Sequence, residues 1–469
     1  MTSLLRVLLL GVFMAALDSA VIAPVIPAIQ TEFGINHREV GLMMSAFVLF
    51  SLTSTVLMSH LSDRLGRRPI FLSGVALFAL GSLVIAGAGA WGSHQAGWLG
   101  FGWVMLGRVL QGLGSGGIVP SASAVIGDVL PPDQQGRALG WIGAVYGMAF
   151  VLGPPLAGAL TVWASWPWIF LINLPLALYL LRAGAQQLPP PVAQSPHSPT
   201  ALNPATDWLG LGLFFSGLFA LLLGLTQLGD AFTGRLIWPW ALLTAGILLI
   251  LFVQVENRVS QQGQRAMVPL VLFSHRRLAI TYGLTLGSGM GMGGIAFLTS
   301  LATHNFGVSA QHAGFVLLPL VLCSMLSSMR SGQLLHRLGA RRLILAGFAA
   351  LTLGYGGSAL AALLQGGLLT FGLFTALVGL GVGILVGGAL RSIALQEAPA
   401  DLRATAQGLI NLFNGLGTLL ATTAISVLAD VIGDTGGRGF PVAYLGLACA
   451  LLALWGLALC LPAKPDQTP

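Results

Sequence analysis

Long apolar segments separated by short polar stretches occupy nearly the whole chain. Most reach about 18 residues or more, the length that a helix needs to cross the hydrocarbon core of a bilayer. The pattern predicts an all-α polytopic membrane protein with about fourteen membrane-spanning helices. We expect these spans at residues 5–29, 39–60, 70–90, 97–118, 138–160, 167–185, 207–229, 236–255, 278–302, 312–331, 343–364, 368–392, 405–430 and 441–461.

Arginines between the spans predict which ends face the cytoplasm. The turn 61–69, Leu-Ser-Asp-Arg-Leu-Gly-Arg-Arg-Pro, is strongly basic and joins two predicted spans, so it should remain cytoplasmic. With this turn inside, seventeen cations lie in cytoplasmic segments and three, Arg38, Arg235 and Arg438, lie outside. Such a separation supports the span count and predicts that both termini are cytoplasmic.

Composition excludes several other classes of protein. Only 7% of the 469 residues are charged and 55% are hydrophobic, whereas a soluble protein carries about 25% charge. The net charge of +7 comes from scattered arginines, a pattern that indicates membrane topology rather than a nucleic-acid surface. Cys323, Cys449 and Cys460 lie in apolar segments, and the eight histidines lack ligand spacing. We therefore expect no disulfide framework, no metal site and no cofactor.

The chain contains two copies of one arrangement. The matched segments are 32–35 with 305–308 and 61–69 with a degraded copy in 332–342, both offset by 273 residues; 110–116 with 377–383, offset by 267; and Asp133 and Gly140 with Asp401 and Gly408, offset by 268. Eight predicted spans separate the two starting points, and an even number gives both copies the same orientation. The result is a parallel repeat about an axis along the membrane normal.

The repeat divides the chain into two six-helix bundles with an inserted hairpin. The two spans of 207–255 have no counterpart in the other copy, and the Pro-rich stretch before them predicts an extended linker. We expect an N-terminal bundle at 1–185, a cytoplasmic linker at 186–206, the hairpin at 207–255, a cytoplasmic loop at 256–277 and a C-terminal bundle at 278–469.

Asp18 and Arg108 are the ionisable residues predicted deep within spans. A charge at mid-bilayer costs about 2.5–3.5 kcal/mol on insertion scales, so such residues usually face a cavity and carry function. Asp18 is a carboxyl that could be loaded and unloaded with a proton, or a structural carboxylate held by hydrogen bonds. Arg108 keeps its charge and needs an acceptor, for which Asp18, a carbonyl or water are candidates. If the two pair, protonation of Asp18 could be coupled to movement of Arg108.

Glycines and prolines within the spans have a structural interpretation. Residues 112–117 contain a formal G-x-G-x-x-G, but a dinucleotide-binding turn must follow a strand, and this one lies inside a membrane helix. Its small residues instead allow close helix packing. Gly153-Pro154-Pro155 should kink its span, either as a hinge between the halves or as a passive bend. Asp63 in the basic turn can pair with arginines or cap a neighbouring helix end.

These residues together resemble the major facilitator superfamily, and in particular its fourteen-span drug:proton antiporter group. The similarity covers residues from about 10 to 460. The matching motifs are Leu17-Asp18 with Pro27, with Ala20 and Ala23 in place of Thr and Asn; the basic turn with Ser59 in place of Gly; Arg108 with Gln111-Gly112; Gly140 and Gly153-Pro154 with Gly158; and Trp166-Pro167-Trp168 leading to Asn173-Leu174-Pro175, without the usual Arg.

The resemblance assigns roles to particular residues. It implies that Asp18 and Arg108 couple proton movement to transport, and that Gly153, Pro154 and Gly158 form the antiporter motif of the fifth span. Two latch turns would hold the inner gate, with the residues Asp63, Arg64, Gly66, Arg67 and Arg68 in the first and Gly332, Arg337 and Gly339 in the second. For the substrate cavity we expect Met14, Asp18, Tyr146, Phe150, Tyr282, Met290, Phe297, Asn411 and Asn414.

The resemblance implies a secondary transporter that exports lipophilic or cationic drugs in exchange for protons by rocking alternating access. One buried acid predicts one proton per cycle and neutral or monocationic substrates. We expect a monomer in a bacterial inner membrane whose partners are lipophilic substrates, protons and lipid, without nucleic acid. Export of an endogenous lipid or metabolite is the alternative. An enzyme would need clustered nucleophiles, bases or metal ligands, which the sequence lacks, and a receptor would show no proton-linked flux.

Overall fold

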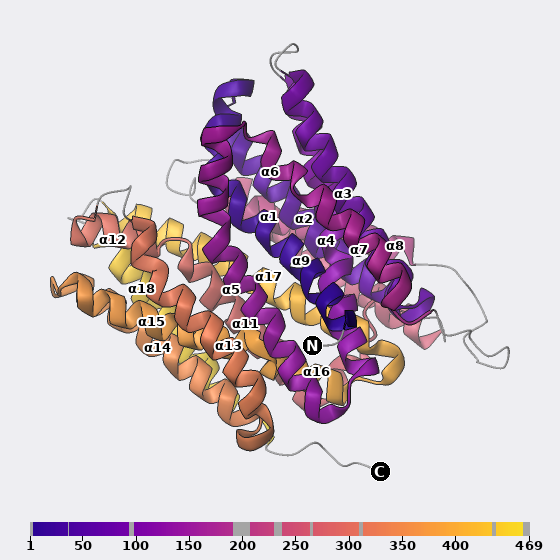
Figure 1. Cartoon of the computed structure of the whole chain (residues 1–469). Coiled ribbons are helices and arrows are strands. Elements are labelled where there is room, and N and C mark those ends of the chain that lie inside the picture. Colours follow the sequence, from indigo (N-terminus) through magenta and orange to yellow (C-terminus); the bar gives the residue numbers. More distant parts are fainter. Residues whose placement is uncertain are drawn as a thin grey trace.

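The computed structural model describes residues 3–35, 37–92, 98–190, 207–228, 237–262, 266–308, 313–433 and 438–462, and every regular element in these ranges is a helix (Figure 1). Thirteen of the described helices are long and apolar enough to span a membrane. A fourteenth span results when α11 (Arg276–Ile295) and α12 (Leu298–Phe306), which are bent by 42° at their junction, count as one. The predicted all-α fold with fourteen spans is confirmed.

The N-terminal half is a bundle of six spans, the last of which consists of two short helices. Its helices are α1 (Ser3–Phe33), α2 (His37–Leu65), α3 (Arg67–Gly92), α4 (Trp98–Val129), α5 (Pro132–Trp163), α6 (Pro167–Leu171) and α7 (Asn173–Gln187). α4 packs between α2 and α3, and α1 packs along α5. Buried aromatic and branched residues such as Phe71, Phe78, Ile85 and Phe170 fill this half.

The C-terminal half repeats these packing partners. After α11 and α12 come η3 (Ala313–Leu317), α13 (Leu318–Leu338), α14 (Ala340–Leu363), α15 (Leu368–Ile384), η4 (Leu385–Ala389), α16 (Leu390–Glu397), η5 (Ala400–Leu402), α17 (Arg403–Gly433) and α18 (Gly439–Leu459). α15 packs between α13 and α14, as α4 does between α2 and α3, and α11 packs along α17, as α1 does along α5. The two turns that join equivalent helices both contain a glycine in the left-handed region, Gly66 at φ +96° and Gly339 at φ +76°.

The two halves meet through helices that the repeat relates to each other. α2 packs on α17, and its counterpart α13 packs on α5. Figure 1 shows the halves converging at the lower right, where α16 and the start of α5 lie, and diverging toward the upper left. We call the converging end the basic end, because it carries Arg64, Arg67, Arg68 and Arg403.

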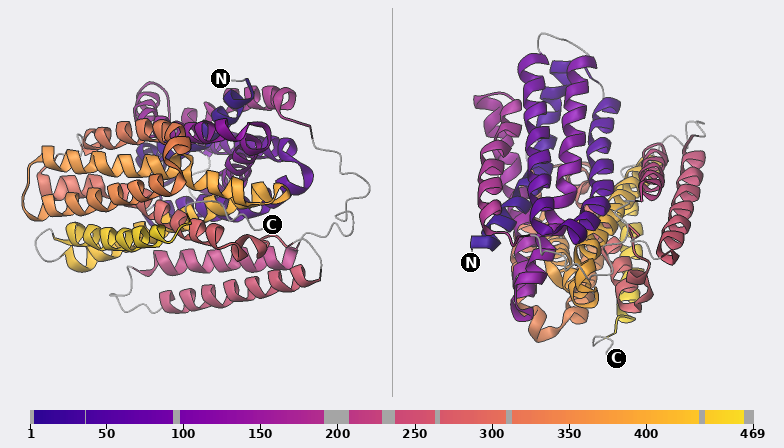
Figure 2. Two further views of the ribbon diagram at one scale, coloured as in Figure 1. Left: turned by 90° about the horizontal axis from the view of Figure 1, so that it is seen from below. Right: turned by 90° about the vertical axis from the view of Figure 1, so that its right-hand side faces the viewer.

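The inserted hairpin consists of α8 (Trp208–Thr226) and α9 (Ile237–Gln261) and lies along one side of the bundles, as the left view of Figure 2 shows. Asp207 caps α8 by accepting a hydrogen bond from the Gly210 N–H at 2.8 Å. α8 packs on α2 and α17, beside the junction of the halves. The segment that follows, predicted as a polar loop, has a buried apolar centre around Met267, and the buried carboxylate of Glu256 accepts from the Val268 N–H at 3.1 Å.

One π-helical turn explains why the repeat offset changes from 267 to 268. The element η4 is a π-helix within the span that contains α15 and α16, and its Gly388 has a left-handed φ of +116°. A π turn accommodates one extra residue within a helix. The offset between the copies is 267 residues before this turn and 268 after it. Residues after η4 therefore follow the offset of 268, which makes Arg391 the repeat equivalent of Ser123.

Helix contacts across the C-terminal half depend on glycine. A Cβ atom added to Gly289 of α11 would lie 1.9 Å from the backbone oxygen of Asn414 in α17. We expect Gly289→Ala to lower the thermal unfolding temperature of the detergent-solubilised protein by many degrees, because the clash is with backbone that cannot rotate away. Overpacking of this kind costs about 1–3 kcal/mol or more. The control is Gly283→Ala in the same helix, where the nearest atom, of Leu457, is 3.4 Å away. Equal unfolding temperatures of the two variants would contradict the expectation.

Candidate functional site

A polar cluster is buried within the N-terminal half, and an ion pair lies at its centre. Arg108 of α4 donates through Nη1 to Oδ2 of Asp18 in α1 at 2.7 Å, and both side chains are 1% exposed. The same nitrogen donates to Oε1 of Gln111 at 2.8 Å. Of the acceptors considered for Arg108 from sequence, the structure selects the carboxylate of Asp18. Because the pair is buried, removal of one partner is strongly destabilising, since it leaves an uncompensated charge in the core.

Three neutral residues complete the polar cluster. Gln111 donates to Oδ1 of Asp18 at 2.8 Å and to Oγ of Ser82 at 2.9 Å. Asn173, from the first turn of α7, donates to Ser82 at 3.1 Å and approaches Asp18 at 3.5 Å. Gln111 and Asn173 belong to the motifs that carry the sequence resemblance, whereas Ser82 lies in an apolar span with no motif around it. Four helices therefore fix the position of one carboxyl group.

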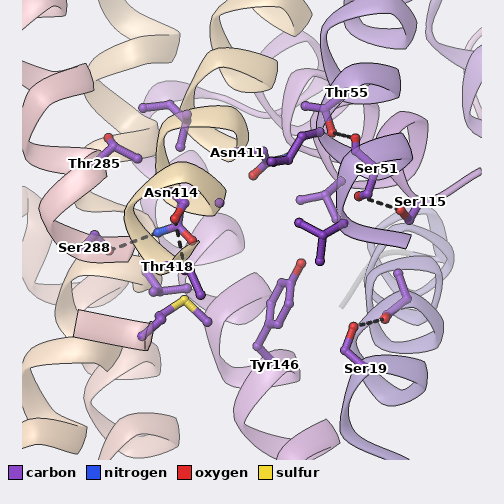
Figure 3. Close-up of a pocket in the computed structure, with 18 of the residues that line it drawn as sticks. Ser19, Ser51, Thr55, Ser115, Tyr146, Thr285, Ser288, Asn411, Asn414 and Thr418 are labelled. Carbon is purple, nitrogen blue, oxygen red and sulfur yellow. Dashed lines mark hydrogen bonds between the residues drawn. The ribbon is translucent and has the colours of Figure 1, made fainter. Parts of the chain in front are cut away.

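A cavity of about 270 Å³ lies between the two halves (Figure 3). It is lined by hydroxyl groups from both halves, by Asn411 and Asn414 of α17 and by branched apolar side chains. In Figure 3 the Tyr146 ring of α5 points into the space between Ser51 and Ser115 on one side and Asn414 on the other. Ser51 and Ser115 are hydrogen bonded to each other at 2.8 Å, and Asn414 donates to Ser288 at 3.4 Å.

Phe47 separates the polar cluster from the cavity. Its ring lines the cavity, and the guanidinium carbon of Arg108 lies 4.2 Å from the ring centroid. Ala15 and Ser19, which flank Asp18 on α1, also line the cavity, although Asp18 itself does not. One aromatic ring, that of Phe47, and one turn of α1 therefore connect the ion pair to the cavity wall.

The cavity residues expected from sequence are distributed over several environments. Tyr146, Asn411 and Asn414 line the cavity. Met14 and Tyr282 are buried in apolar clusters, Tyr282 being stacked on Phe413 with ring centroids 5.6 Å apart. Met290 and Phe297 pack against the C-terminal core, and Phe150 is 44% exposed.

Arg391 is the cavity residue that sequence reasoning placed elsewhere. The sequence places it at the last turn of the predicted span 368–392 and assigns its charge to the cytoplasmic side. In the structure it follows η4, is 7% exposed and lines the cavity. It donates to Oδ1 of Asn411 at 2.6 Å, to Oε1 of Gln407 at 3.4 Å and to Oγ of its repeat equivalent, Ser123, at 3.3 Å.

The first latch turn joins the two halves at the basic end. Asp63 caps α17 by accepting from the N–H of Ala404 at 3.0 Å and from the N–H and hydroxyl of Thr405, each at 2.7 Å. It also pairs with Arg67 of α3. Arg67 and Arg403 converge on Asp128 at 3.0 and 2.9 Å. These contacts bind the ends of α2, α3, α4 and α17 together.

The other residues expected in the latch turns have varied surroundings. Arg64 lines a second cavity next to Asp63, and Gly66 forms the turn between α2 and α3. Arg68, by contrast, makes no hydrogen bond or ion pair within the described ranges. In the second latch turn Gly332 lies against the backbone of Gly136, so that a Cβ would be 2.5 Å from the Gly136 oxygen. Gly339 forms the equivalent turn, and Arg337 is exposed.

The predicted antiporter motif lies within one helix, because α5 continues from Pro132 to Trp163. Gly153 allows α5 to approach α1, since a Cβ there would lie 2.6 Å from the Cβ of Ala20. Gly158 has no atom within 4 Å of such a Cβ. The side chain of Pro154 is outside the described part of the structure.

Two repeated helical bundles with a cavity between them are an architecture found in membrane transporters built from parallel repeats. The sequence profile of the Major Facilitator Superfamily matches residues 8–422, and the chain belongs to this family. A relative from Bacillus subtilis, the uncharacterized MFS-type transporter YfiU, is 32% identical over 91% of this chain and 80% of its own length. The multidrug transporter protein MdtP of Bacillus subtilis is 28% identical over 85% of this chain and 69% of its own length.

Another relative and two solved structures are also similar to this chain. The putative multidrug resistance protein MdtD of Klebsiella pneumoniae is 27% identical over 90% of this chain and 85% of its own length. The structure of the human organic anion transporter MFSD10 matches with a TM-score of 0.69 at 17% identity, covering 97% of this chain and 99% of that one. The proton:xylose symporter XylE matches with a TM-score of 0.70 at 14% identity, over 98% and 95% of the two chains.

Proposed function

We propose that this protein is a proton-coupled antiporter that exports small lipophilic molecules. The observation that supports this most directly is the Asp18–Arg108 ion pair, which is buried beside the cavity but outside it. A carboxyl in this position can exchange a proton without touching the substrate. The multidrug names of the relatives MdtP and MdtD favour drugs among the possible lipophilic substrates.

Protonation of Asp18 would act through Arg108. When Asp18 is ionised, the two charges neutralise each other and hold α1 against α4. A neutral Asp18 leaves the guanidinium with Gln111 and with the ring of Phe47, and breaking a buried pair in this way costs about 3–5 kcal/mol unless the structure rearranges. Movement of Phe47, which lines the cavity, would transmit that rearrangement to a bound substrate.

We propose that the basic end faces the cytoplasm of a bacterium and that the described conformation faces outward. The concentration of arginines at this end supports the orientation. The contacts of Asp63 and Asp128 hold the halves together there, and the halves diverge toward the other end. In the proposed cycle Asp18 takes up an external proton, the halves rock to open the basic end, and substrate binds as the proton leaves to the cytoplasm. We further propose that a monomer carries out the cycle in the inner membrane, with lipid around it and without nucleic acid.

The experiment that tests this proposal uses the wild-type protein reconstituted into liposomes. We expect an imposed pH gradient to drive accumulation of lipophilic dyes in the direction opposite to proton flow, and addition of dye to release protons. Dye transport whose rate and direction do not depend on the pH gradient would contradict proton coupling. A folded wild-type protein that moves none of the dyes would favour the alternative, export of an endogenous lipid or metabolite.

A further inference from the structure

Arg391 differs from the other deeply buried arginines in how its charge is balanced. Arg108 and Arg277, which are 1% and 6% exposed, each form an ion pair with a carboxylate, Asp18 and Glu397 respectively. Arg391 is 7% exposed, and within the described part of the chain it has no carboxylate at ion-pair distance. Its acceptors, Asn411, Gln407 and Ser123, are all neutral. These hydrogen bonds orient the guanidinium but leave its charge uncompensated.

The position of this charge relates it to the cavity. Of the described residues that line the cavity, only Arg391 has a charged side chain. The other lining groups are hydroxyls, two amides and apolar side chains such as Leu52, Val119 and Ile410. A buried charge is costly unless it is paired, so an anionic group placed beside Arg391 would be stabilised there. A guanidinium also presents a planar set of donors that matches a carboxylate, sulfonate or phosphate group.

The repeat shows that this charge belongs to one half only. The equivalent residue in the N-terminal half is Ser123, which Arg391 contacts across the junction of the halves at 3.3 Å. Placement of a cation on one side of the junction gives the cavity a positive end near α16 and α17.

We propose that the cavity binds amphiphilic anions, with the acidic group on the Arg391 guanidinium and the apolar body against the branched side chains of the wall. This assignment rests on the proposed export function and names its substrate class. It differs from the neutral or monocationic substrates that the sequence indicated. That expectation took Asp18 to be the charge in the cavity, whereas Arg108 neutralises Asp18 outside it.

The test compares three fluorescent probes that share one dansyl group but differ in charge. Dansylglycine is an anion, its methyl ester is neutral and dansylcholine is a cation. We expect the purified wild-type protein to bind dansylglycine at least tenfold more tightly than the ester and the ester more tightly than dansylcholine, after subtraction of signal from protein-free micelles. In Arg391→Gln we expect affinity for dansylglycine to fall at least tenfold and affinity for the ester to change less than twofold. Arg391→Lys, which keeps the charge but not the planar donors, should lie between.

Each outcome bears on one proposal. Equal or tighter binding of dansylcholine by the wild type would overturn the anion site, even if Arg391→Gln failed to fold. So would an equal loss of ester and anion binding in Arg391→Gln, because it would indicate a structural role. If a pH gradient drives transport of all three probes to the same extent, the export function stands and the anion site fails. If a folded wild type neither binds nor moves any probe, the export function fails as well.

Two sources of the acidic group can be distinguished by competition. Octanoate carries a carboxylate on a single short chain, whereas dihexanoyl phosphatidate carries a lipid phosphate. Displacement of dansylglycine by both would indicate a free amphiphile with either group, and displacement by phosphatidate alone would indicate a lipid headgroup. Displacement of dansylglycine by neither competitor would overturn the assignment to a general anion site.

Discussion

Replacement of Asp18 by asparagine is expected to abolish uphill transport while substrate exchange continues. Asparagine has nearly the same shape, but it cannot bind and release a proton. Its single oxygen can accept from Arg108 or from Gln111, which in the wild type donate to different oxygens of Asp18. In liposomes with an imposed pH gradient, we expect accumulation of a transported dye to stop at its equilibrium level. Counterflow is the exchange of labelled for unlabelled dye without a gradient. We expect its rate to stay within about tenfold of the wild-type rate, which corresponds to a change of about 1.4 kcal/mol in the transport barrier.

Loss of the carboxylate also affects stability, and the controls must separate the two effects. The single variant leaves Arg108 as an unpaired buried charge, at a cost of about 3–5 kcal/mol. The double variant Asp18→Asn with Arg108→Gln removes both charges and should regain most of the thermal stability, but not the coupling. A matched acid on the same helix, Glu32, accepts from the indole nitrogen of Trp166 at 2.5 Å and lies outside the polar cluster. Glu32→Gln should therefore remain coupled.

Two results would contradict this role of Asp18. Uphill transport that survives in Asp18→Asn at the wild-type level would place the proton elsewhere. Recovery of uphill transport in the charge-neutral double variant would show that Asp18 serves only to neutralise Arg108. The energy at stake is substantial, because one charge that crosses a membrane potential of 100 mV releases about 2.3 kcal/mol.

The fold was predictable because membrane insertion imposes simple rules. Apolar length sets the spans and arginine placement sets their orientation, so fourteen spans and a parallel repeat follow from the sequence alone. The ion pair could be predicted from the sequence for a related reason. Charges deep in a span are rare, and two of opposite sign, Asp18 and Arg108, favour each other as partners in a low-dielectric bundle.

The cavity was less predictable, because hydropathy does not report which way a helix face points. Aromatic and methionine residues such as Met14 and Tyr282 suit a binding site and a helix core equally well, and the structure places both in apolar clusters. The hydroxyl residues that line the cavity, including Ser51 and Ser115, are short and common in membrane helices. Nothing in their spacing separates a cavity wall from a helix contact.

Arg391 shows how a local backbone feature can reverse an interpretation. An arginine at the end of an apolar segment normally extends its charge toward the water outside. The π turn η4 inserts one residue before it, and the side chain lies in the cavity instead. The one sequence signal was the change of the repeat offset from 267 to 268, which requires an insertion between residues 383 and 401.

The two latch turns resemble each other in sequence, but the second turn has no acid at the position of Asp63. His336 occupies the position equivalent to Asp63, at the offset of 273 that relates the turns. Asp63 caps α17, whereas His336 is exposed and makes no hydrogen bond within the described ranges. A carboxylate can accept from the free N–H groups at a helix start, and it is favoured there by the helix dipole. At the basic end, the position of Asp63 therefore provides hydrogen bonds between the halves that the equivalent position of His336 does not.

Replacement of Asp63 by alanine is expected to open the basic end. The change removes three hydrogen bonds to α17 and one of the two carboxylates that pair with Arg67, the other being Asp128. One lost helix cap costs about 0.5–2 kcal/mol, and the charged bonds add to this. A total near 3 kcal/mol would shift a two-state equilibrium by about a hundredfold. Spin labels at Gln134 of α5 and Arg337 of α13, in a background with Cys323, Cys449 and Cys460 replaced by serine, should report a longer distance by pulsed electron resonance.

The repeat provides the matched control for this measurement. His336→Ala removes a side chain at the equivalent position, and Arg68→Gln removes a charge from the same turn as Asp63, so neither should lengthen the distance between the labels. Lengthening in all three variants would indicate general loosening of the basic end rather than release of a latch. An unchanged distance in Asp63→Ala would mean that contacts deeper in the junction, such as the hydrogen bond of 2.9 Å from Ser328 to the Gly140 oxygen, are sufficient to hold the halves together. A lengthening confined to Asp63→Ala would establish that one carboxylate controls access to the cavity from this end.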